Sequence, residues 1–67
     1  STASEETRRI HYIKGILRNR LNYVPANIVQ FLTKAVSDGI ELDHLQEMAL
    51  NASNWTCFRG YVEGALE

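Results

Sequence analysis

The sequence predicts an all-α fold, a small bundle of four short helices, or of three if the last two segments merge. Apolar residues recur with helical spacing in four segments, and no stretch alternates apolar and polar residues with period two. The chain has 67 residues, 45% of them hydrophobic, which is enough for one small core and one domain. We expect this helical domain to span residues 5–67, after a polar, disordered tail at residues 1–4.

The first predicted helix covers residues 5–21. Ser4 can cap it, and Glu5 and Glu6 then lie in its first turn, where the helix dipole favours anions. Its apolar stripe follows 3, 4, 4 spacing and consists of Ile10, Ile13, Leu17 and Leu21. One side of this helix is therefore predicted to face the core.

Pro25 predicts the boundary before a second helix, because proline lacks the amide donor but suits a first helical turn. This helix is expected over residues 26–37. Its apolar spacing is the most regular in the chain and consists of Ile28, Phe31, Leu32, Ala35 and Val36. Gly39 follows the stripe and should end the helix by adopting a positive φ.

Two further helices are predicted, over residues 42–51 and from residue 55 onwards. Glu41 and Asp43 lie at the start of the third, where the dipole favours anions, and Asn54 suits the N-cap of the fourth. Taken together, the four stripes predict a core that includes Ile13, Leu17, Leu21, Ile28, Phe31, Leu32, Leu45, Ala49, Phe58 and Val62.

Positive charge is concentrated in the first twenty residues, which hold five of the chain's seven Lys and Arg residues. This part also contains two glutamates and has a net charge of +3, whereas the remainder has a net charge of −4. Four side chains share one arc of the first helix, and we call them the basic arc: Arg8, His11, Lys14 and Arg18. Arg9 and Arg20 flank it, and all six are candidate nucleic-acid-binding residues. Such an asymmetry indicates an anionic partner at the basic end.

The leading hypothesis is a non-enzymatic binding module whose first helix engages DNA or RNA. The basic arc extends over about 15 Å of helix, a length that can meet successive phosphates. Tyr12 could stack on an unpaired base, as aromatic side chains do in single-strand binders. Two alternatives remain open. The arc can be a solvated or internally paired surface, or it can face an acidic protein surface.

The sequence contains no Gly-rich phosphate loop, no nucleophile elbow and no His-Glu-x-x-His pair, so we expect neither enzymatic activity nor a cofactor. Cys57 is the single cysteine, and together with His11 and His44 it completes no recognisable set of metal ligands. A lone cysteine cannot form a disulfide within the chain, which favours an intracellular, cytoplasmic location. No apolar run approaches the roughly 20 residues that span a bilayer, so no membrane insertion is expected.

The competing hypothesis is a protein-interaction domain that belongs to a larger protein or assembly and docks through an apolar, aromatic patch. The candidate residues for this patch are Tyr23, Met48 and Trp55, because large aromatic side chains are enriched at interface hot spots. We expect a monomer or a weak dimer, and a dimer would form through the first helix.

The order of features is similar to that of the helical C-terminal domain of DnaD-type replication-initiation proteins. The resemblance covers about residues 9–66. It begins with Pro25 before a helix whose Ile28 and Phe31 point inward. Asp38-Gly39, a short helix at residues 43–50 and a closing helix at residues 58–66 follow in the same order as in the family. The family's Tyr-Ile-x-x-Ile-Leu pattern is loosely matched by Tyr61, Val62, Ala65 and Leu66, with Ala65 in place of the second Ile. The resemblance implies DNA binding in replication, with Tyr61 contributing.

Overall fold

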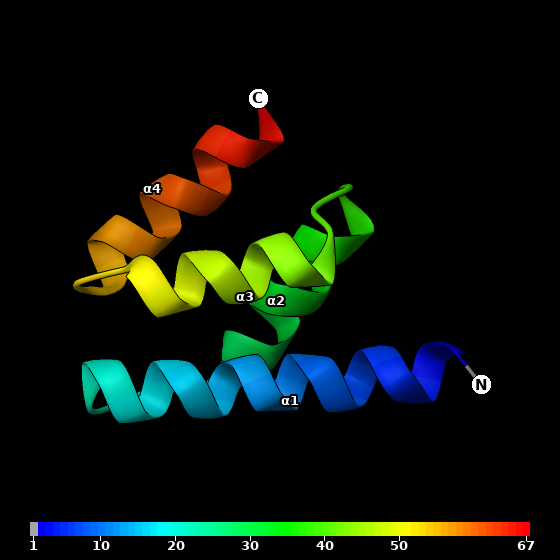
Figure 1. The fold of residues 1–67 in the computed structure, drawn as a ribbon, viewed down its shortest axis with the longest axis horizontal. Helices are drawn as coiled ribbons and strands as arrows, with labels where there is room; N and C mark the ends of the chain where they lie inside the picture. Colours follow the sequence, from blue (N-terminus) through cyan, green and yellow to red (C-terminus); the bar gives the residue numbers. More distant parts are fainter. Residues whose placement is uncertain (1) are drawn as a thin grey trace.

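Four helices pack around a shared apolar core in the computed structural model (Figure 1), which describes the backbone of residues 2–67 and the side chains of residues 4–67. They are α1 (Thr2–Leu21), α2 (Ile28–Ser37), α3 (Leu42–Asn51) and α4 (Trp55–Leu66). Residues 2–67 contain no β-strand, so the all-α prediction is confirmed. Residues 52–54 separate α3 from α4, and the bundle therefore has four helices and not three.

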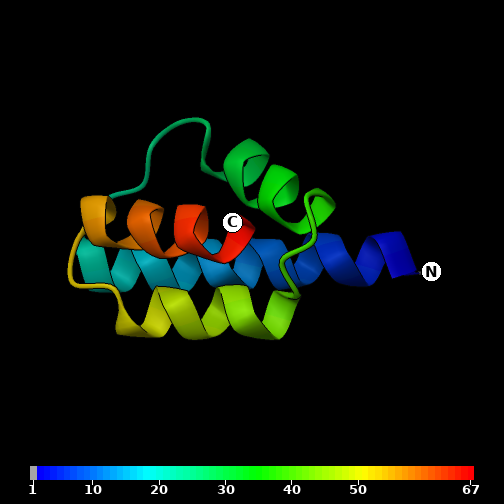
Figure 2. The same cartoon turned by 90° about the horizontal axis from the view of Figure 1, so that it is seen from above.

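The helices are arranged so that α1 and α4 lie on opposite sides of the core, with α2 and α3 between them (Figure 1). In the view turned by 90°, α2 and α3 lie on opposite flanks of the α1–α4 pair (Figure 2). The Cα radius of gyration is 10.9 Å, close to the value of about 11 Å typical of a compact chain of this length. One long side of α1 is turned away from the other three helices (Figure 1).

The first helix starts earlier than predicted, at Thr2 and not at residue 5. Ser4 consequently lies within the helix and does not cap it. No Gly or Pro interrupts residues 2–4, and Ala3 is a strong helix former. Of the predicted disordered tail, Ser1 lies outside the described residues. At its other end α1 stops at Leu21, where Asn22 turns the chain with a φ of 73°.

The second helix begins two residues later than predicted, because Pro25 belongs to the preceding turn. The Ile28 amide donates to the carbonyl of Pro25 at 3.1 Å, and helical bonding starts only beyond this turn. The prediction for Gly39 is confirmed, since its φ is 116°. The Gly39 amide donates to Val36 O and the Ile40 amide to Ala35 O, at 3.0 and 3.1 Å. This pair of bonds is a Schellman motif, in which only glycine adopts the required φ without strain.

The third and fourth helices have the predicted starting points. α4 is capped by Asn54, whose side-chain Oδ1 accepts a 2.7 Å hydrogen bond from the amide of Cys57. A cap of this kind contributes about 1 kcal/mol to helix stability. The Ala52 amide still donates to Met48 O at 3.0 Å, so the chain leaves α3 only at residue 52. The short connection therefore directs α4 back across the core.

All four helices contribute to the core. Its largest fully buried side chains are Phe58, Ile13, Leu17, Leu32, Leu45 and Val62. Two predicted core residues, Leu21 and Phe31, are only partly buried, because Leu21 ends α1 and Phe31 lies at an open edge near Trp55. Conversely, Ile40 and Ala52 are buried although they lie between helices, where a search for helical stripes does not find them.

Candidate nucleic-acid interface

The basic arc of α1 stands in solvent. Arg8, His11 and Arg18 are exposed and Lys14 is partly exposed. At 100° per residue the four side chains span about 120° of the helix circumference. Among the side chains of residues 4–67, the ion pairs formed are Arg9–Asp43 and Lys34–Asp38, and neither includes a residue of the arc. The arc thus presents cations that form no ion pair with a carboxylate of residues 4–67, although Glu5 and Glu6 lie near Arg8 at its amino end.

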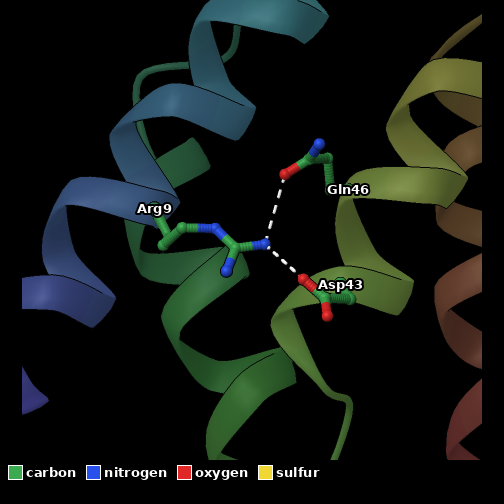
Figure 3. Close-up of polar contacts among 3 residues, drawn as sticks. All are labelled: Arg9, Asp43 and Gln46. Atoms are coloured by element: carbon green, nitrogen blue, oxygen red, sulfur yellow. Dashed lines mark hydrogen bonds and ion pairs between the residues drawn. The ribbon is translucent and has the colours of Figure 1, made fainter.

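Arg9, which flanks the basic arc, is paired within the bundle in this structure, and its contact with nucleic acid stays a prediction. Its guanidinium Nη2 contacts Asp43 Oδ1 at 2.7 Å and donates to Gln46 Oε1 at 3.2 Å, both on α3 (Figure 3). The Asp43 side chain is 88% exposed, so this ion pair contributes only about 0.2–1 kcal/mol. The main effect of the pair is to fix the position of the Arg9 side chain against the start of α3.

Arg20, the second flanking cation, also makes contacts within the bundle, and its predicted contact with nucleic acid is not tested by them. Its Nη1 donates to Ala49 O at 2.9 Å and to Ala52 O at 2.7 Å. Both acceptors lie at the carboxyl end of α3, where the helix dipole favours a cation. Eleven residues correspond to about three helical turns, so Arg9 and Arg20 share one side of α1. They therefore hold the two ends of α3.

Replacing Arg20 by glutamine is expected to destabilise the domain by about 1 kcal/mol, because a charged donor to two carbonyls is lost. Thermal unfolding followed by circular dichroism should show a fall of several degrees in Tm. Oligonucleotide affinity should change less than in Arg18→Gln, the matched variant within the basic arc. Equal losses of oligonucleotide affinity in the two variants would show that Arg20 contacts the oligonucleotide as directly as Arg18 does.

Tyr12 and Gly15 complete the solvent-facing side of α1. Tyr12 is 59% exposed. Gly15 is also exposed, and a Cβ built on it would meet no atom within 4 Å. Internal packing therefore does not require glycine here, although glycine costs about 1 kcal/mol within a helix relative to alanine. Gly15 lies one helical turn from both Tyr12 and Arg18.

Tyr61 lies apart from the basic arc, since α4 and α1 occupy opposite sides of the core (Figure 1). It is 42% exposed and borders a shallow depression with residues of α3. Its side-chain hydrogen bond to Cys57 lowers the pKa of the thiol, and the backbone of Ser53 lowers it further, while burial acts in the opposite direction. The same hydrogen bond, together with the charge of the thiolate, raises the pKa of Tyr61.

Tyr61→Phe is expected to shift the alkylation of Cys57 to higher pH. The hydroxyl that stabilises the thiolate is lost, so less thiolate is present at any pH below the ordinary thiol pKa. The measurement is the rate of reaction with iodoacetamide as a function of pH, followed by mass spectrometry. Tyr12→Phe, which removes an exposed hydroxyl from α1, should leave the profile unchanged. Coincident profiles for wild type and Tyr61→Phe would contradict the expectation.

The three residues of the predicted docking patch are not brought together. Met48 is only 7% exposed and belongs to the core, so it is not available as a docking side chain. Tyr23 and Trp55 do meet: their ring centroids are 6.0 Å apart, and Trp55 Nε1 donates to Tyr23 O at 3.2 Å. Tyr23 is 60% exposed and Trp55 partly exposed. The patch is therefore reduced to this aromatic pair.

Within residues 2–67, no three His, Cys, Asp or Glu side chains are grouped so as to hold a metal ion. None of the helices in the same range is both long and apolar enough to cross a membrane. Comparison of the chain with protein-family models, with curated proteins and with solved structures finds no match. The resemblance to DnaD-type proteins therefore remains a hypothesis based on the sequence.

Proposed function

We propose that this protein is a non-enzymatic binding module whose α1 surface engages the phosphate backbone of DNA or RNA. The observation that carries the proposal is the basic arc: Arg8, Lys14 and Arg18 share one side of α1, and no carboxylate of residues 4–67 forms an ion pair with them. The chain as a whole has a net charge of −1. The cations are thus segregated on a protein that is otherwise acidic, which favours one oriented mode of approach to an anionic polymer.

The number of cations in the arc allows an estimate of the affinity for nucleic acid and of its salt dependence. Three neutralised phosphates give a slope of log K against log salt of about −2 to −3, and binding without sequence preference has a Kd of roughly 10⁻⁴ to 10⁻⁶ M. The exposed ring of Tyr12 adds a stacking surface for unpaired bases. A cytoplasmic location, which the lone cysteine favours, and a monomeric or weakly dimeric state are part of the proposal. A role in replication rests only on the resemblance to DnaD-type proteins.

The test is fluorescence anisotropy with labelled single-stranded and duplex 20-mers of generic sequence, at salt concentrations from about 20 to 300 mM. Saturable binding that weakens with the expected slope supports the proposal. The absence of binding at low salt, or binding that is indifferent to salt, refutes it. An acidic peptide that competes as effectively as the oligonucleotide would instead favour an acidic protein surface as the partner.

A further inference from the structure

A small pocket opens between the start of α2 and the start of α4, on a different part of the molecule from the basic arc. It has a volume of about 290 Å³ and is lined by Pro25, Asn27, Ile28, Phe31, Trp55 and Arg59. Ile28 is 3% exposed, whereas Pro25, Phe31 and Trp55 are partly exposed. Apolar atoms provide most of this lining, and the volume lies at the lower limit of ligand-binding pockets.

The two aromatic residues that line the pocket, Phe31 and Trp55, both pack against the buried ring of Phe58. The Trp55 ring packs edge-on against Phe58 with centroids 5.9 Å apart, and Phe31 lies 6.2 Å from Phe58. Phe58 is fully buried. The Trp55 Nε1–H is directed to Tyr23 O, so the ring is also fixed from the side of the α1–α2 connection. The pocket is therefore preformed, which reduces the entropy lost when a ligand binds.

The charged group that lines the pocket is a cation. Arg59 is its single charged lining residue, is exposed, and forms none of the ion pairs among residues 4–67. Asn27 contributes from the N-cap of α2, which has no side-chain cap hydrogen bond and no acidic residue in its first turn. Both the guanidinium and the positive end of this helix dipole favour an anion at the mouth.

We propose that the pocket binds a linear peptide segment of a partner protein, one that carries a large apolar side chain next to a carboxylate. The apolar side chain enters between Phe31 and Trp55, and the carboxylate meets Arg59 at the rim. The volume is sufficient for one such side chain but not for a nucleotide or a large cofactor. This binding site is independent of the basic arc, so each proposal can fail without the other.

Trp55 is the chain's only tryptophan and lines this pocket, so its indole N–H resonance is a single, assignable probe of binding here. The probe is the acetylated, amidated peptide Gly-Asp-Phe-Glu-Gly, compared with Gly-Asp-Ala-Glu-Gly and Gly-Asn-Phe-Gln-Gly. The first should shift the indole resonance saturably, with a Kd of about 0.1 mM for a single anchor. Each control peptide should bind about tenfold more weakly, since each lacks one of the two recognition elements.

The variant Arg59→Glu should weaken binding of the first peptide by about tenfold. Lys34→Glu makes the same change in charge on the last turn of α2, at a residue that does not line the pocket, and should change binding less than twofold. Because both residues are exposed, the fold should persist, and the remaining amide spectrum checks this. Absence of a saturable shift, or equal binding to wild type and Arg59→Glu, overturns the proposal. So does equally tight binding of free N-acetylphenylalaninate, which would identify a small carboxylate and not a peptide as the ligand.

Discussion

Replacing Lys14 and Arg18 by glutamate should lower oligonucleotide affinity at least about a hundredfold at low salt and reduce the salt slope by about two. Both residues lie within the basic arc, so the change removes two phosphate contacts and adds two repulsive charges. Glutamate is a good helix former, and neither side chain forms an ion pair among residues 4–67. The fold should therefore persist, and anisotropy titrations at several salt concentrations measure the loss.

The chain offers a matched control for this experiment. Lys34 and Arg59 are the two cations beyond residue 20, and reversing both changes the net charge by the same amount, from −1 to −5. This control should retain most of the affinity, because it leaves α1 intact. If both double variants lose affinity equally, overall charge determines binding, and the basic arc has no special role.

Phe58→Ala is expected to remove a large share of the domain's free energy of unfolding. Phe58 is fully buried and contacts both Phe31 and Trp55. Truncation of a buried phenylalanine costs about 3–5 kcal/mol, whereas a domain of this length has a total stability of roughly 3–10 kcal/mol. Urea denaturation followed by circular dichroism and by Trp55 fluorescence would show the loss as a lowered midpoint or as a missing folded baseline.

Leu50→Ala provides the comparison for Phe58→Ala, since Leu50 is 48% exposed at the end of α3. Its cost should be about 0.5 kcal/mol or less. A cost below about 1 kcal/mol for Phe58→Ala would mean that the aromatic centre of the bundle is not tightly packed. The pocket beside Trp55 would then lack the rigid support described above.

Helical periodicity was sufficient to predict the architecture, because each helix exposes one side and buries the other. Ile13, Leu17 and Leu32 follow directly from it and are fully buried. Ile40 could not be found in this way, since it is buried by the motif that ends α2 and lies outside any helical stripe. The early start of α1 and the late start of α2 reflect the general difficulty of placing helix ends from local preferences.

The candidate site was only partly predictable. The spacing of Arg8, Lys14 and Arg18 placed them on one arc, and the structure leaves this arc unpaired among residues 4–67. Arg9 and Arg20 were predicted to flank that arc, but their hydrogen-bond partners are 29 to 37 residues away in the chain. Local patterns cannot reveal such contacts. The pocket beside Trp55 was missed for the same reason, since α2 and α4 form it jointly.

Under the proposed function the two sides of α1 have different roles, and this predicts two classes of mutant. One side, through Arg9 and Arg20, anchors α3 at both ends. The other, through Arg8, Lys14 and Arg18, faces outward. A library that randomises this helix should thus give two classes of defective variant. Changes on the anchoring side should destabilise the fold and lower the amount of protein in the cell. Changes on the outward side should leave the amount of protein unchanged but abolish nucleic-acid binding. Few clones should show both defects from a single codon.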